Sequence, residues 1–147
     1  MNADTGVTEL EHVLVLSADI ERSRDFYERA LGMQAGDRPP FQFTGYWLYA
    51  SGRPCLHIAD RASYRAHVRT LGLHVPSIAS GPGPVDHIAF RAADYEALER
   101  RLAALAVRPV RNQVPNGGPR QLFFDDPDGT RIEINVTAPT TKAGLDD

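Results

Sequence analysis

The sequence is short of cysteine, of lysine and of long apolar runs. Cys55 is the single cysteine among 147 residues, so no internal disulfide can form and the composition suits a reducing compartment. Acidic residues stand near the N-terminus, where a secretory signal would need a basic start and an apolar run. Apolar stretches are broken by glycine, proline or charge, so no membrane span is expected. These absences predict a cytoplasmic protein without a membrane partner.

The basic residues are almost all arginine and do not cluster in the sequence. Fifteen of the sixteen are arginine, they are scattered along the chain, and the formal net charge is −3. Nucleic-acid binding usually needs a clustered basic face, so no nucleic acid is expected as a partner. A chain of this length can bury roughly two-thirds of the surface that its unfolded form exposes.

An internal repeat is the main positive feature of the sequence. "HVLVLSAD" at 12–19 and "HIAFRAAD" at 87–94 share a histidine, an apolar run of strand character, and an Ala-Asp pair at the same distance. Each aspartate stands where a helix N-cap belongs. The pattern predicts one helix from about Ile20 to Leu31, stopped by Gly32, and a second from about Tyr95 to Ala106.

The repeat continues at the far end of each half. "SGRPCLHIAD" (51–60) resembles "PDGTRIEINV" (127–136): a glycine turn leads into a short strand with a polar residue between two aliphatic ones. Each half has room for two more strands, expected near 41–43 and 46–50 in the first and near 107–113 and 120–125 in the second. The expected fold is therefore α+β. Two βαβββ modules in pseudo-twofold repeat should form a curved, mostly antiparallel eight-stranded sheet with outer helices.

The domain boundaries follow from the repeat. We expect an N-terminal tail (1–8), a single domain (9–137) and a flexible C-terminal tail (138–147). Within the domain lie module one (9–60), a connector (61–83) and module two (84–137). The connector holds the Gly/Pro-rich stretch "VPSIASGPGP". It also holds His67 and His74, and both are expected to be surface histidines.

Polar residues at matching strand positions predict a metal site. The polar slot of a mostly apolar first or last strand is filled by His12, His57, His87 and Glu133. Pseudo-twofold symmetry would bring these slots together near the axis. Three imidazoles and a carboxylate suit a divalent ion, and without His57 the set is the two-histidine, one-carboxylate arrangement. The alternatives are a structural His57 bonded to the backbone and a Glu133 paired with Arg131.

The sequence resembles the vicinal oxygen chelate superfamily, which contains glyoxalase I, fosfomycin-resistance enzymes, extradiol dioxygenases and bleomycin-resistance proteins. The resemblance covers about 9–137 and rests on "HVLVLSADIERSRDFYERALGM", "VDHIAFRAAD" and "LFFDDPDGTRIEI". It implies a homodimer with one divalent ion per site, which is Zn, Ni, Mn or Fe(II). It also implies metal ligands on the first and last strands of each module, at the positions of His12, His57, His87 and Glu133.

The resemblance further implies a metal-dependent lyase or isomerase of glyoxalase-like type. Such an enzyme acts on a small substrate with vicinal oxygens through an enediolate, which the metal stabilises as a Lewis acid. Glu133 would be the catalytic base, and His57 a fourth ligand or an acid–base group. The residues expected to bind substrate are Phe123 and Gln121, on the face of Glu133, together with Trp47 and Tyr49.

Two other functions compete for the same residues. An extradiol Fe(II) dioxygenase usually has a phenol in the pair before the closing turn, whereas this pair is Leu122-Phe123; that function requires His57 as its acid–base group. A non-catalytic drug-binding resistance protein generally lacks the ligands, so the full set argues against it. Glyoxalase I itself usually has glutamate at the position of His57, and the sequence has no evident cationic cluster that could bind the carboxylates of glutathione. Both points argue against a glutathione hemithioacetal as the substrate.

Overall fold

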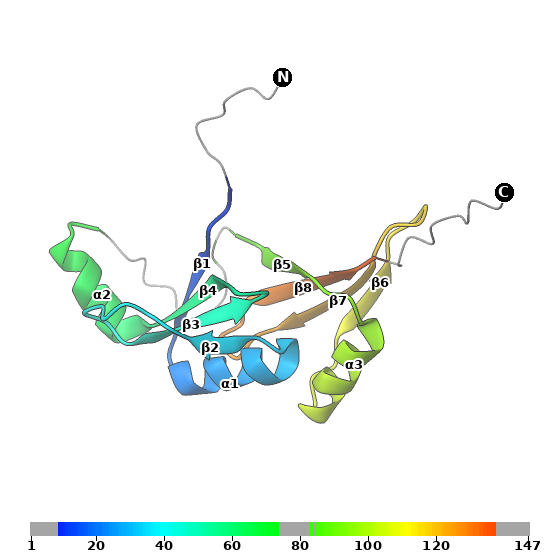
Figure 1. Ribbon diagram of the computed structural model, residues 1–147, viewed down its shortest axis with the longest axis horizontal. Coiled ribbons are helices and arrows are strands. Elements are labelled where there is room, and N and C mark those ends of the chain that lie inside the picture. Colours follow the sequence, from blue (N-terminus) through cyan, green and yellow to red (C-terminus); the bar gives the residue numbers. More distant parts are fainter. Residues whose placement is uncertain (1–8, 74–82, 84, 138–147) are drawn as a thin grey trace, which may run out of the picture. The chain divides into compact units, whose positions relative to one another are not determined.

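The computed structural model describes residues 9–73, 83 and 85–137 (Figure 1). The chain divides into two compact units, Met1–Ser77 and Ile78–Asp147. Both predicted tails, His74 and most of the Gly/Pro-rich stretch of the connector lie outside the described residues. Among the helices that are described, none has the length and apolar character needed to cross a membrane.

The first unit is a four-stranded sheet with a helix packed on one face. Its elements are β1 (Val13–Ser17), α1 (Ile20–Leu31), β2 (Gln34–Gly36), β3 (Gly45–Ala50), β4 (Arg53–Asp60) and α2 (Arg61–Thr70). The strand order is β1-β4-β3-β2, in which β1 and β4 are parallel and the other pairs antiparallel. Helix α1 contacts the two central strands, β3 and β4.

The second unit repeats this arrangement strand for strand. Its elements are β5 (His87–Arg91), α3 (Tyr95–Ala104), β6 (Val110–Gln113), β7 (Arg120–Asp125) and β8 (Arg131–Val136). The order is β5-β8-β7-β6, again with one parallel and two antiparallel pairs. The α+β class and the two mostly antiparallel βαβββ modules are therefore confirmed, with the eight strands present as two four-stranded sheets.

Both repeated helices begin at the predicted N-caps. The Asp19 and Asp94 carboxylates each accept a hydrogen bond from a main-chain N–H of the first turn, over 3.1 and 2.9 Å. Helix α1 ends at Gly32, whose φ of 68° is left-handed and costs glycine little. Helix α3 ends at Ala104, two residues before the predicted end, because Ala106 already has a φ of 57°.

One predicted strand is misplaced. The second strand of the first module is β2, directly after α1, and residues 41–43 are not in a strand. The alternation Phe-Gln-Phe suggested a strand there, but Pro39 and Pro40 precede it and supply no N–H for a ladder. The rings of Phe41 and Phe43 instead stack with centroids 5.3 Å apart.

The predicted connector begins with a helix. Helix α2 follows β4 without a break, because the Asp60 carboxylate accepts the main-chain N–H of Ser63 over 2.8 Å and so caps it. Val68 is its buried residue. The helix has no counterpart after β8 in the second unit among the described residues.

The core of each unit lies between its sheet and its helix. Its most buried aliphatic residues are Leu48, Leu56 and Ile58 in the first unit and Leu102, Leu122, Ile132 and Ile134 in the second. Side chains alternate across a strand, so His57, between Leu56 and Ile58, lies on the opposite face. Glu133 has the same position between Ile132 and Ile134. Each sheet therefore presents its predicted ligands on the face away from its core.

Candidate metal centre and adjoining pocket

The two units present their predicted ligands in the same register. The β1 residue paired with His57 is the second after His12, and the β5 residue paired with Glu133 is the second after His87. Residues two apart on a strand share a face. His12 therefore belongs with His57, and His87 with Glu133. His87 opens β5, whereas His12 immediately precedes β1.

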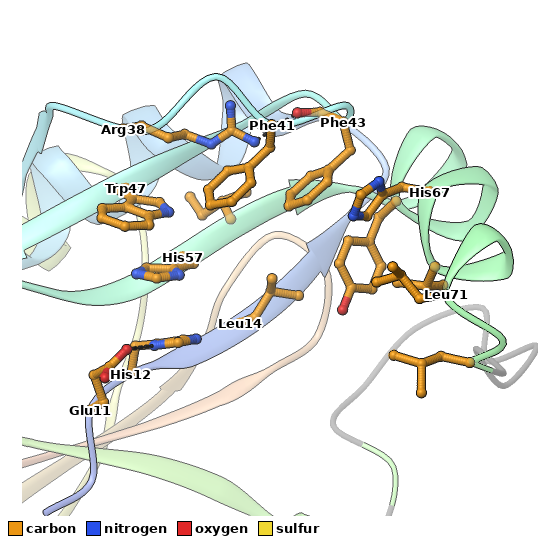
Figure 2. A pocket seen from close by; sticks show the side chains of 14 residues that line it. Glu11, His12, Leu14, Arg38, Phe41, Phe43, Trp47, His57, His67 and Leu71 are labelled. Atoms are coloured by element: carbon orange, nitrogen blue, oxygen red, sulfur yellow. Dashed lines mark hydrogen bonds and ion pairs between the residues drawn. The ribbon is translucent and has the colours of Figure 1, made fainter.

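In the first unit, three aromatic rings form a continuous stack (Figure 2). The His57 ring lies between Trp47, with centroids 4.2 Å apart, and His12, with centroids 3.9 Å apart. Both interplanar angles are small, at 10° and 15°. His57 is only 7% exposed, and its Nε2 donates to the Pro54 carbonyl oxygen over 3.0 Å. This hydrogen bond leaves Nδ1 as the unprotonated nitrogen of a neutral ring.

The environment of His57 favours the neutral ring. Burial lowers the pKa of His57, and the neighbouring His12 lowers it further. The hydrogen bond to the Pro54 carbonyl opposes these effects, because it stabilises the protonated form. The net direction is downward, so the Nδ1 lone pair is available at neutral pH.

An acidic residue precedes each of the other two histidines and fixes its tautomer. Nδ1 of His12 lies 2.9 Å from a Glu11 carboxylate oxygen, and Nδ1 of His87 lies 2.8 Å from Asp86. Since a carboxylate accepts, Nδ1 carries the proton and Nε2 is left with a lone pair. Neither acid was predicted from the sequence, although Glu-His and Asp-His recur 75 residues apart.

Glu133 lies next to His87 and is oriented by an amide. Oε1 of Glu133 is 3.7 Å from Nε2 of His87, and Oε2 accepts from the Asn135 side chain over 2.8 Å. Arg131 pairs with Asp86 over 3.2 Å, so it is not engaged in the alternative ion pair with Glu133. The pKa of Asp86 is lowered by its hydrogen bond with His87 and then by the charge of Arg131.

A chain of amide hydrogen bonds extends from Glu133 across the second sheet. Gln121 donates to Asn135 over 3.0 Å and accepts from Asn112 over 2.7 Å. Phe123 is the β7 residue directly opposite Glu133. Gln121 and Phe123 thus lie on the face of Glu133, and the amide chain ties β6, β7 and β8 together behind the carboxylate.

The donor atoms suit a divalent ion, with one reorientation. Two atoms that each lie roughly 2.0–2.2 Å from a zinc ion are at most about 4.4 Å apart, so the 3.7 Å between His87 and Glu133 fits a shared ion. Imidazole lone pairs lie in the ring plane, and the stacked planes of His12 and His57 are nearly parallel. One ring must turn before both can bind one ion. Within the described part of either unit, no three His, Cys, Asp or Glu side chains form a metal-binding group.

A pocket of about 420 Å³ adjoins the stack in the first unit (Figure 2). Its aromatic walls are Phe41, Phe43, Trp47 and Tyr64, and its polar groups include Arg38 and His67 beside the two stacked histidines. Helix α2 supplies Tyr64 and His67. His67 was expected at the surface, but it is half-buried, with its ring 5.1 Å from that of Phe43.

Tyr49, a predicted substrate-binding residue, has a different environment. Its hydroxyl donates to the Asp37 carbonyl over 2.6 Å, and its ring lies against Gly36. It is not among the described residues that line the pocket. Of the two aromatic residues predicted on β3, Trp47 is therefore the one at the pocket.

Comparison with known proteins agrees with this architecture. A Listeria monocytogenes fosfomycin resistance protein shares the fold, with a TM-score of 0.65 and 15% identity over 90% of this chain and 96% of that one. A lactoylglutathione lyase from Agrobacterium tumefaciens gives a TM-score of 0.66 and 18% identity over 88% of this chain and 94% of the other.

Sequence comparison places the chain in a family. Glyoxylase I 4 from Arabidopsis thaliana is 32% identical over 150 aligned positions, which cover 91% of this chain and 76% of the relative. The family model for the glyoxalase/bleomycin resistance protein/dioxygenase superfamily matches residues 9–134. The chain belongs to the glyoxalase/bleomycin resistance protein/dioxygenase superfamily.

Proposed function

We propose that the protein is a divalent-metal-dependent lyase or isomerase of glyoxalase-like type, acting on a small substrate with two adjacent oxygens. The observation that carries the proposal is the matched register of the two ligand pairs, His12 with His57 and His87 with Glu133. The relative named Glyoxylase I 4 and the fold shared with a lactoylglutathione lyase support the reaction class. A related fosfomycin resistance protein was crystallised with Mn(II), which supports a divalent ion.

Each of the four residues has a distinct part in the proposal. His12 and His87 would each bind the ion through Nε2, because their Nδ1 protons are donated to carboxylates. His57 would bind through Nδ1, because its Nε2 donates to the Pro54 carbonyl oxygen, once the parallel stack of His57 and His12 has opened. The bound ion supplies Lewis acidity to the substrate oxygens. Glu133 is both ligand and base.

The chemistry assigned to Glu133 is removal of a proton from the carbon next to a carbonyl. Its Oε2 accepts a hydrogen bond from Asn135, so Oε1, which faces His87, is the oxygen that would hold the ion at rest and would accept the proton once substrate takes its place. General-base catalysis needs the carboxylate within hydrogen-bond reach of that proton. Phe123, directly across the strand pair, lies beside the carboxylate and helps to exclude water from it.

The orientation of His57 favours one competing function. A His57 that keeps its place in the stack leaves two histidines and one carboxylate, the ligand set of many non-haem Fe(II) oxygenases. The neutral His57 ring could then act as the acid–base group of a dioxygenase. Oxygen uptake by the Fe(II)-loaded protein with catechol tests this function; unchanged uptake in His57→Ala would exclude His57 from the acid–base role.

The location and assembly of the protein are further parts of the proposal. We propose a cytoplasmic homodimer that binds a small molecule, because the family resemblance implies a dimer and the single Cys55 suits a reducing compartment. Light scattering after gel filtration measures the assembly directly. A mass of one chain, 16.2 kDa, at all concentrations would exclude the dimer.

Metal titration of matched variants tests the proposed centre. Wild-type protein stripped of metal should bind one Zn, Ni or Mn ion per chain by calorimetry, and Glu133→Gln should lose this binding. Asp125→Asn, on the neighbouring strand β7, is the acidic control and should bind normally. Activity is measured as deuterium exchange next to the carbonyl of 2-hydroxyacetophenone, and it should disappear in Glu133→Gln. Full metal occupancy in that variant would remove Glu133 from the ligand set.

A further inference from the structure

We propose that the pocket beside the His57 stack binds the aromatic carboxylate portion of the substrate, and that Arg38 receives the carboxylate. That the bound molecule is the substrate rests on the proposed function; that the pocket binds an aromatic carboxylate does not. The inference comes from the placement of one arginine in an apolar pocket and from the aromatic walls around it.

Arg38 is held by two aromatic rings and one carbonyl. Its guanidinium carbon lies 5.0 Å from the ring centroids of Phe41 and of Phe43, within the range of cation–π attraction. One terminal nitrogen donates to the Phe43 carbonyl oxygen over 2.7 Å. Its Nε is buried and has no hydrogen-bond partner among the described residues. The group is oriented, yet part of its donor capacity is unused.

Arg38 also differs from three other arginines of the same unit in lacking an acidic partner. Arg24, Arg29 and Arg53 pair with carboxylates over 2.9, 3.2 and 3.0 Å. In the described part of the chain, no carboxylate pairs with Arg38. Burial lowers its pKa, so the surroundings do not compensate its charge. A planar fork with unused N–H groups suits a bound carboxylate, which can accept two parallel hydrogen bonds.

The walls of the pocket select the rest of the ligand. Phe41, Phe43, Trp47 and Tyr64 offer ring faces and edges, and aliphatic residues complete the lining. Aromatic rings pack favourably against such walls, and a volume of about 420 Å³ falls in the range of small-molecule sites. Among the described residues that line the pocket, Glu11 is the acidic one, and it hydrogen-bonds His12. His67, on α2, is a polar lining residue in addition to Arg38. The pocket therefore suits a small aromatic molecule with one carboxylate.

The position of the pocket links it to the proposed chemistry. The pocket is lined by both histidines of the first ligand pair, His12 and His57, as well as by Arg38. A substrate anchored by its carboxylate at Arg38 would extend its other end toward those histidines. The ligand would thus be oriented before any reaction, which is the usual gain from a charged anchor in an apolar site.

Binding to metal-free protein tests the pocket separately from the metal centre. Trp47 is the single tryptophan and lines the pocket, so its fluorescence reports occupancy. The probes are phenylacetate, its neutral analogue phenylacetamide, and acetate, titrated into protein treated with EDTA. We expect saturable quenching by phenylacetate, with about ten-fold or greater preference over the amide, because a hydrogen bond to a charged group is worth that much. Equal binding of acid and amide would overturn the proposal.

Matched arginine variants identify the anchor. Arg38→Gln should weaken phenylacetate binding about ten-fold or more and leave phenylacetamide binding unchanged. Arg53→Gln, in the same unit but outside the pocket lining, should bind both probes like wild type. Undiminished phenylacetate binding by Arg38→Gln would exclude the anchor. Because the acid and amide are also compared on wild-type protein, a poorly folded variant leaves the test intact. If the wild-type protein bound no metal in the separate calorimetric titration, the proposed metal centre would be refuted, but the proposed carboxylate pocket would not.

Discussion

The side-chain amide of Asn135 donates to Oε2 of Glu133 over 2.8 Å, while Oε1 of the same carboxylate lies 3.7 Å from Nε2 of His87. Oε2 of Glu133 is thus fixed by a hydrogen bond, while Oε1 faces His87. Groups that orient a ligand in this way strengthen metal binding without contacting the ion. The arrangement makes Asn135 a positioning residue in the proposed centre.

Replacement of Asn135 should weaken metal binding. We expect Asn135→Ala to lower the affinity for Zn or Mn by about 10-fold, the lower end of the effect of losing an outer hydrogen bond. Asn112→Ala, which removes the far end of the same amide chain, should have a smaller effect. Calorimetric titration measures both affinities. Equal losses would show that the chain stabilises the sheet and does not orient Glu133.

Glu11 and Asp86, the acidic residues that precede His12 and His87, should contribute equally to metal affinity. Asp86→Asn removes the anionic acceptor for Nδ1 of His87, and Glu11→Gln does the same for His12. Each should lower metal affinity by about 10-fold, because the imidazole becomes less basic and its tautomer is no longer fixed. Asp37→Asn is the exposed control. If only Asp86→Asn reduced affinity, the proposed equivalence of the two halves would fail.

The pKa of His57 should lie below the usual value of about 6.5 in metal-free protein, because burial and His12 both lower it. NMR titration of the ring protons measures it. In His12→Ala the pKa should rise, since one of the lowering influences is gone.

The depressed pKa has a consequence for stability. The unfolded chain takes up the His57 proton at higher pH than the folded one, so the free energy of unfolding should fall as pH drops below about 6.5 toward the folded pKa. His57→Gln should remove this part of the pH dependence, as measured by urea unfolding at several pH values. An unaltered dependence would contradict the assignment to His57.

Metal binding should change the fluorescence of Trp47. The stack of Trp47 on His57 and His12 must open if both histidines are to bind one ion. The emission change should saturate at one ion per chain and be absent in His57→Ala. Constant wild-type emission at full metal occupancy would contradict this opening of the stack.

The core beneath the ligand-bearing face should be sensitive to truncation. Leu56, with no exposed surface, precedes His57 on β4, and Leu56→Ala should destabilise the protein by about 2–5 kcal/mol. Leu10, which is 79% exposed, provides the control, and Leu10→Ala should change stability by less than about 0.5 kcal/mol. Denaturant unfolding measures both. A small effect of Leu56→Ala would contradict the close packing of this core.

Much of the fold could be predicted because its signals are local. The aspartates at 19 and 94 begin helices at the expected positions, and Gly32 ends the first. The prediction of a strand at 41–43 was wrong, because the Phe-Gln-Phe alternation is compatible both with a strand and with a loop in which the two rings stack. Helix α2 was missed because it has no counterpart in the internal repeat, although Asp60 caps it and its apolar residues follow a helical period.

The sequence by itself determined the two βαβββ modules and the polar slots of His12, His57, His87 and Glu133. Short-range periodicity and capping specify the elements, and the repeat specifies the slots. Only the tertiary structure decided what those slots contact: the ring stack on Trp47, the amide chain behind Glu133 and the aromatic support of Arg38. These contacts join side chains from separate strands and loops, and their geometry depends on strand register and ring orientation, which no local pattern encodes.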